Sequence, residues 1–188
     1  MKKIAFIIAF ATISSTAAFA VHPDGWGVGI VGRGAWGYGR GGLGGAALSL
    51  KAPAVPIFWG MALDFGGNYF GFSVTGDHHI AGGMLTDPGG PMLGWYLGLG
   101  GFVNFTTFNP TFGSWTSFSF GGRLPIGLTL QIPAGSVAFE VFAAFVPNLG
   151  FGFWFWNSRY NDYWRAQDRS RLGLVGGFGG ELGVRLWL

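Results

Sequence analysis

Charged side chains recur along the second half of the chain at spacings that could form ion pairs. Glu181 and Arg185 lie four residues apart, so on a β-strand both would point to the same face. Glu140 would come opposite Arg185 if the two segments formed a hairpin, and Arg123 would lie one strand further round. The full predicted network consists of Arg123, Glu140, Glu181, Arg185, Arg33 and Asp64.

Enclosed by a small ring of strands, such a network has two interpretations. It could form a gate or a selectivity constriction whose ion pairs rearrange to admit small solutes. Alternatively, it could be a static set of satisfied charges in an interior that side chains nearly fill. We expect the static network, because a ring of eight strands leaves little free space.

A polar stretch from 157 to 170 combines arginines with aromatic residues. Both kinds of side chain are favoured at binding interfaces, so the stretch could bind an extracellular or host ligand. The candidate contact residues are Arg159, Tyr160, Tyr163, Trp164, Arg165 and Arg169. A solvated loop beside interfacial aromatics is the interpretation we favour.

One short segment could suggest catalysis. Ser73 precedes the run Asp77, His78 and His79, and a serine or histidine could serve a lipid-modifying enzyme. On a strand, however, the two adjacent histidines point to opposite faces, and no second acid is placed to orient either one. We therefore predict no catalytic residues.

Two further motifs are too weak to indicate a cofactor or a metal. The glycines at 27, 29 and 32 match a dinucleotide-binding fingerprint, but no strand precedes them and no helix pattern follows. His22 and Asp24 are two scattered ligands and do not make a metal site. We predict neither a cofactor nor a bound metal.

The elements that must position these residues are strands whose outer faces are apolar. Bulky apolar residues alternate with small or polar ones, as in Ile57, Trp59 and Met61. The charges of the strands all fall on the opposite phase: Arg33, Lys51, Asp64, Asp77, Arg123, Glu140, Glu181 and Arg185. This pattern suits strands that face lipid, where Arg or Lys costs about 2 to 4 kcal/mol at the midplane. A soluble ligand-binding barrel is the third class of protein considered.

Turn signals divide the chain into eight strands, an even number that permits closure. They are expected at 25–36, 43–51, 56–65, 69–80, 92–105, 116–131, 136–150 and 171–188. Hydrocarbon offers no hydrogen-bond partner for the edges of an open sheet, so the sheet must close on itself. We predict an all-β fold, a closed antiparallel up-and-down transmembrane β-barrel.

The first twenty residues indicate export. Lys2 and Lys3 precede an apolar run from Ile4 to Ile13, and the residues at 18–20 fit a cleavage site after Ala20. We therefore expect a signal peptide over 1–20 and one barrel domain over 21–188. The chain is 49% hydrophobic but only 10% charged, with a net charge of +3, which gives no footprint for nucleic acid. It has no cysteine, so disulfides do not stabilise it.

Several motifs together resemble those of small bacterial outer-membrane barrels. The closing GGELGVRLWL, with the export signal and the amphipathic strands, is similar to barrels of the OmpA, OmpX and OmpW type. GWYLGLGGFVNF at 94–105, GGRLPIGL at 121–128 and EVFAAFVPNLG at 140–150 resemble a spirochaetal barrel family of undefined function. The chain ends in Leu188, whereas the pattern of such families ends in an aromatic residue.

The resemblance implies a location in the bacterial outer membrane and insertion by the outer-membrane assembly machinery. We expect an integral barrel in contact with outer-membrane lipid, with a structural or surface-interaction role and no catalysis. A narrow passage for small or hydrophobic solutes is the alternative, and a lipid-modifying enzyme is a second one.

Overall fold

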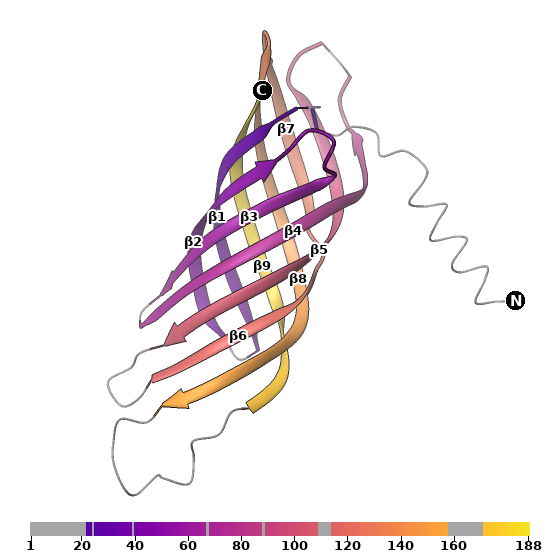
Figure 1. Cartoon of the computed structure of the whole chain (residues 1–188). Helices are drawn as coiled ribbons and strands as arrows, with labels where there is room; N and C mark the ends of the chain where they lie inside the picture. Colours follow the sequence, from indigo (N-terminus) through magenta and orange to yellow (C-terminus); the bar gives the residue numbers. More distant parts are fainter. Residues whose placement is uncertain are drawn as a thin grey trace, which may run out of the picture.

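Within the described residues, nine antiparallel β-strands hydrogen-bond side by side and close into a ring in the computed structural model of the chain (Figure 1). The structure describes residues 22–23, 25–38, 40–66, 68–87, 89–108, 114–157 and 171–188. The strands are β1 (Gly27–Tyr38), β2 (Arg40–Lys51), β3 (Ile57–Gly66), β4 (Tyr69–Met84), β5 (Met92–Phe108), β6 (Ser114–Arg123), β7 (Ile126–Ala134), β8 (Val137–Asn157) and β9 (Arg171–Trp187).

The ring has eight strand positions, because β6 and β7 share one of them. The order β4-β3-β2-β1-β9-β8-β6-β5 is closed by pairing of β4 with β5, and β7 also lies between β5 and β8. The prediction of one strand over 116–131 is therefore corrected to two strands, separated at Leu124 and Pro125. Proline has no N–H to donate to a ladder. Hydrogen bonds continue across the break from Leu124 N to Pro147 O, 2.9 Å, and from Gly98 N to Pro125 O, 2.7 Å.

The other predicted strands are present, but several are longer than the sequence pattern indicated. β4 continues to Met84, β5 to Phe108 and β8 to Asn157. The extension of β8 is supported by its pairing with β6, whose first residue Ser114 lies opposite Asn157. Turn-forming glycines and prolines marked ends in the sequence where the ladder in fact continues, since a paired neighbour stabilises an extended backbone that local propensity disfavours.

The two ends of the ring are distinct. Trp26, just before β1, and Leu188, just after β9, exchange backbone hydrogen bonds of 2.9 and 3.2 Å, so the first strand begins where the last strand ends. We call this the terminal end, and the carboxyl terminus marks it in Figure 1. β8 ends and β9 begins at the opposite end, which we call the loop end.

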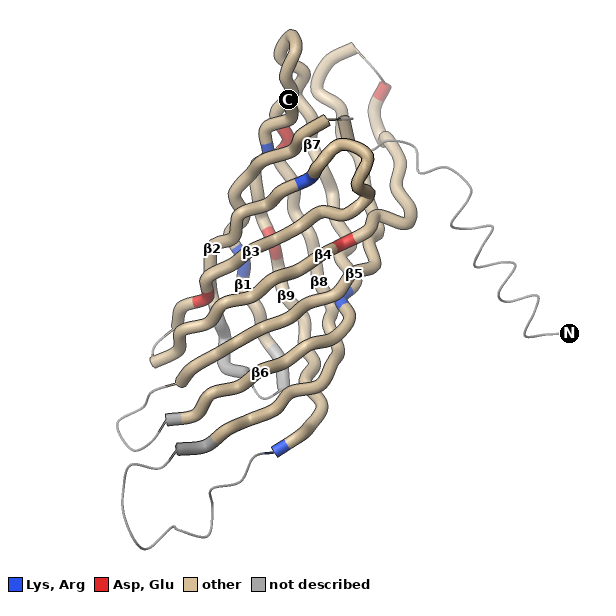
Figure 2. The backbone as a smooth tube through the Cα atoms, in the orientation of Figure 1, with Lys and Arg blue, Asp and Glu red and all other residues tan. Residues whose placement is uncertain are grey.

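The outer face of the ring is apolar and the inner face is polar. Ile30, Leu172 and Leu182 expose between 62% and 65% of their surface, whereas Ser73 and Glu140 expose 1%. Charged residues are spread singly along the strands (Figure 2). The predicted alternation therefore holds, with the polar phase inside. No helix among the described residues is long and apolar enough to span a membrane.

Candidate functional site: the polar interior

The charged residues of the interior form three separate groups. Each group joins strands that are not neighbours in the ring, and such contacts can be made only across the enclosed space. The sequence predicted one network; the structure divides it. Arg33 and Glu181 lie opposite each other in the register of β1 and β9, but the bonds of Arg33 go to Asp64 and those of Glu181 come from Arg123.

The first group links three strands. The guanidinium of Arg33 on β1 contacts both carboxylate oxygens of Asp64 on β3, with Nε donating to Oδ1 at 2.7 Å. The same guanidinium donates to the hydroxyl of Ser73 on β4, which is 1% exposed. A two-pronged contact between Arg and a carboxylate fixes the planes of both groups. Arg33 therefore spans the interior from β1 to β4.

The second group places one arginine between two carboxylates. Arg123 on β6 has Nε 3.0 Å from Asp77 Oδ1 on β4, and it donates through a terminal nitrogen to Glu181 Oε1 on β9 at 2.8 Å. The side chain of Arg123 is 6% exposed, so these contacts are screened little by solvent. When all three residues are ionised the group carries one positive and two negative charges, a net charge of −1.

The third group surrounds Glu140, whose side chain is fully buried. Glu140 lies opposite Arg185 in the register of β8 and β9, and Arg185 donates to its Oε2 at 2.7 Å. Arg185 also donates to Ser49 on β2 at 2.9 Å, and its guanidinium lies between the rings of Phe58 and Phe142, 4.8 and 4.6 Å from their centroids. Glu181 shares the inner face with Arg185, but its partner is Arg123.

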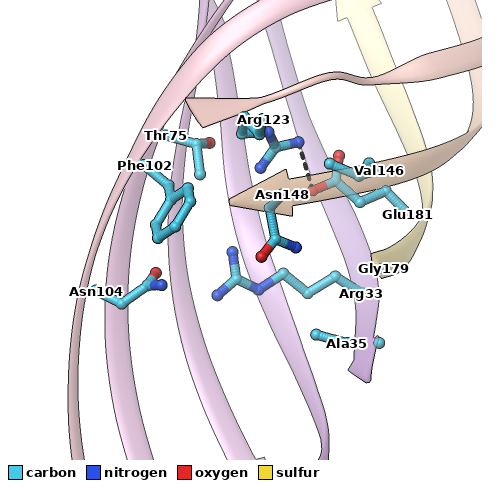
Figure 3. A pocket seen from close by; sticks show the side chains of 11 residues that line it. Arg33, Ala35, Thr75, Phe102, Asn104, Arg123, Val146, Asn148, Gly179 and Glu181 are labelled. Atoms are coloured by element: carbon cyan, nitrogen blue, oxygen red, sulfur yellow. Dashed lines mark hydrogen bonds and ion pairs between the residues drawn. The ribbon is translucent and has the colours of Figure 1, made fainter. Parts of the chain in front are cut away.

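Two internal cavities lie on either side of the Arg123 group. One of about 70 Å³ is lined by Arg33, Phe102 and Asn148 among others, and Figure 3 shows their side chains converging on it. A second of about 50 Å³ is lined by Ser49, Tyr96 and Phe142 among others. Arg123 and Glu181 line both cavities. A polar cavity needs a volume of about 10 to 15 Å³ to hold a water molecule, so both cavities have room for water.

The residues considered for catalysis do not come together. Ser73 and His79 both lie on β4 and face the interior of the ring. Six residues at about 3.3 Å each separate them by roughly 20 Å. His78 lies on the other face and bonds to the carbonyl of Pro56 through Nδ1 at 2.8 Å. The two adjacent histidines thus point to opposite faces, as expected for a strand. Ser73 is instead a partner of Arg33.

Sequence reasoning missed residues at both the second and the third group. Asp77 falls on the inward phase, which was the signal available, but its contact with Arg123 depends on the curvature of the ring. His22 precedes the first strand and has no periodic pattern to place it, yet its Nδ1 lies 2.9 Å from Glu140 Oε1. Lys51 bonds to the carbonyl of the adjacent Ala52 at 2.8 Å, and its ammonium lies 5.8 Å from the centroid of the Phe58 ring.

Several predictions fall outside the described residues. These are the signal peptide over 1–20, Asp24, and the candidate contacts Arg159, Tyr160, Tyr163, Trp164, Arg165 and Arg169. Among the residues that are described, no group of three His, Cys, Asp or Glu side chains is placed to hold a metal ion.

Comparison with solved structures gives a likeness of fold. The N-terminal β-barrel domain of Pseudomonas aeruginosa OprF is similar to this chain, with a TM-score of 0.47 and 14% sequence identity, over 85% of this chain and 96% of that one. No protein-family model and no curated protein sequence matches.

Proposed function

We propose that this chain is an integral outer-membrane β-barrel with a structural role and without catalytic activity. The observation that supports the proposal is the inverted placement of side chains. In the described residues 36 large apolar side chains are exposed, and contiguous apolar patches on soluble monomers seldom exceed a few hundred Å². A lipid environment removes the cost of exposing this surface, and the closed ring satisfies the backbone groups that lipid cannot.

The polar interior suits the same environment. The buried charges meet partners of opposite sign from other strands. Because these side chains lie on the inner face, the backbone of the ring separates them from lipid on the outside. The three groups tie together strands that are distant in the ring. A structural role follows from these ties, because they resist flattening or opening of the sheet.

Heat-modifiability tests this proposal. A closed barrel that resists detergent should migrate differently on a gel before and after boiling, and the protein should enter the detergent-rich phase of a phase separation and the outer-membrane fraction of cells. Partition into the aqueous phase with no change of mobility on boiling would instead support a soluble ligand-binding barrel. Loss of residues 1–20 in the protein from membranes, measured by intact mass, would support a cleaved signal peptide and export.

A narrow passage for small solutes is a second candidate, favoured by the position of Arg123 and Glu181 between the two cavities. Arg123 and Glu181 are joined by a 2.8 Å contact at this point, and Arg33 also lines both cavities. Rearrangement of this ion pair would change the space between the cavities. Reproducible conductance steps of the wild-type protein in planar bilayers, enlarged in Arg123→Gln, would support the passage, whereas silence of the wild type supports the structural role.

A surface-binding role for the stretch 157–170 also stays a proposal. Its support is the joint presence of arginine and aromatic side chains, which are favoured at interfaces. Cleavage within this stretch when protease is added to intact cells would support exposure to an extracellular ligand. Protection from protease would count against it.

A further inference from the structure

His22 precedes the first strand, but its imidazole is inserted into the terminal end of the ring. The side chain is 9% exposed. Its ring lies 4.8 to 5.9 Å, between centroids, from four aromatic rings contributed by β3, β4, β5 and β9. These rings belong to Phe58, His79, Tyr96 and Trp187. A residue outside the ladder thus fills a box built by four strands.

Both nitrogens of this imidazole face a polar group. Nδ1 lies 2.9 Å from Glu140 Oε1, a close approach without hydrogen-bond geometry, and Nε2 lies 2.9 Å from Nδ1 of His79. One of the two facing histidine nitrogens carries the proton of the second contact, since a hydrogen bond needs one donor and one acceptor. The site therefore accommodates a flat ring with one nitrogen beside the carboxylate and the other beside His79.

The contacts of Glu140 explain why the site requires this residue. A carboxylate has about four acceptor positions, and three hydrogen-bond donors and one imidazole nitrogen surround this one. Thr129 and His22 contact Oε1, while Arg185 and Trp187 contact Oε2, all at 2.7 to 2.9 Å. The strands supply the three donors. The imidazole nitrogen comes only from the segment that precedes β1, and without it a fully buried carboxylate would lose one polar neighbour.

His22 packs against part of the wall of the second cavity. Phe58, His79 and Tyr96 line that cavity, and the same three rings contact the imidazole. Removal of the imidazole would therefore leave these three rings without a contact on this side.

We propose that the terminal end of the interior is a binding site for an imidazole ring, and that His22 occupies it as a tethered plug. The site would take a free imidazole when His22 is absent. The proposal rests on contacts inside the ring and does not depend on whether the ring crosses a membrane.

The test is chemical rescue in protein purified in detergent. The chain contains no cysteine, so Ala47→Cys, in a residue that lines the second cavity, introduces a single thiol for a water-soluble reagent. We expect His22→Gly to label several-fold faster than the protein with His22, and free imidazole to restore slow labelling in a saturable manner. Equal labelling rates with and without His22 would overturn the plug. Faster labelling that imidazole does not slow would overturn the imidazole site.

The thermal midpoint gives a second measurement, and His78 provides a matched control. His22→Gly should lower the midpoint by about 4 °C or more, and imidazole should recover most of that loss. His78→Gly removes an exposed histidine that bonds to a carbonyl outside the interior, so imidazole should not change its midpoint. If imidazole shifts both variants equally, its action is unspecific and the proposed site is wrong.

Discussion

Glu140 and Arg185 show how a buried ion pair can matter for this fold without being a large net source of stability. Removing two charges from water costs several kcal/mol, and their attraction returns that cost only when the remaining polar atoms are also satisfied. Here Thr129, Trp187 and His22 complete the set around the carboxylate. The pair therefore specifies the register of β8 against β9, since a slip of β9 by one residue would turn Arg185 to the outer face and leave Glu140 inside without it.

Removal of one member of this pair should be strongly destabilising. Glu140→Ala leaves Arg185 buried without its carboxylate, and the loss of one partner of a buried pair costs about 3 to 5 kcal/mol. The free energy of unfolding in detergent, measured with urea, should fall by that amount. Lys51→Ala, which removes a charge that bonds to an adjacent carbonyl and lies 5.8 Å from the centroid of the Phe58 ring, should change it by less than about 1 kcal/mol. Unchanged heat stability of Glu140→Ala would contradict the pairing.

At the residue scale the sequence predicted directions better than partners. The phase of the alternation placed Glu140, Glu181 and Arg185 inside, and the hairpin between β8 and β9 brought Glu140 opposite Arg185. The bond between Glu181 and Arg123 was not predictable, because it crosses a strand and depends on how sharply the ring curves.

Glycine decides how closely two elements approach each other. Gly121 on β6 lies opposite Gly150 on β8, and a Cβ on either would overlap the backbone of the other strand. At this point the two ladders pack with no side chain between them. Pro125 acts in the same position of the ring, where it separates β6 from β7.

Gly150→Ala should weaken the pairing of β6 with β8. Its methyl group would fall well inside van der Waals contact of the carbonyl of Phe120, so backbone must move, and overpacking of this kind costs about 1 to 3 kcal/mol. Gly180→Ala is the matched control, because a Cβ there meets nothing within 4 Å. We expect a lower temperature for the shift in gel mobility in the first variant only. Equal midpoints would show that the ladder tolerates the methyl group.

At the scale of the whole molecule, the apolar wall makes the environment part of the folded state. Leu182 is 62% exposed in the middle of β9, and Leu85 is 55% exposed just beyond the end of β4. In water the two positions would be equivalent. In a bilayer they differ in depth, and only the deeper one lies against hydrocarbon.

Leu182→Arg should therefore lower the free energy of unfolding in lipid vesicles by about 2 to 4 kcal/mol, and Leu85→Arg by about 1 kcal/mol or less. Urea titration followed by tryptophan fluorescence would measure both. Similar small effects in the two variants would indicate that the outer face does not contact hydrocarbon, and would contradict the proposed location.

The alternation of side chains with a period of two, read from the sequence, determined the class of the fold and the face on which each charge lies. Because that period is a property of every extended backbone, it needs no knowledge of neighbours. The break at Pro125, the grouping of charges around Arg123 and the insertion of His22 beside Glu140 were decided only by the tertiary structure. The last two depend on the closure of the ring, which brings together residues as distant in the chain as His22 and Glu140, 118 positions apart, and no local pattern records that distance.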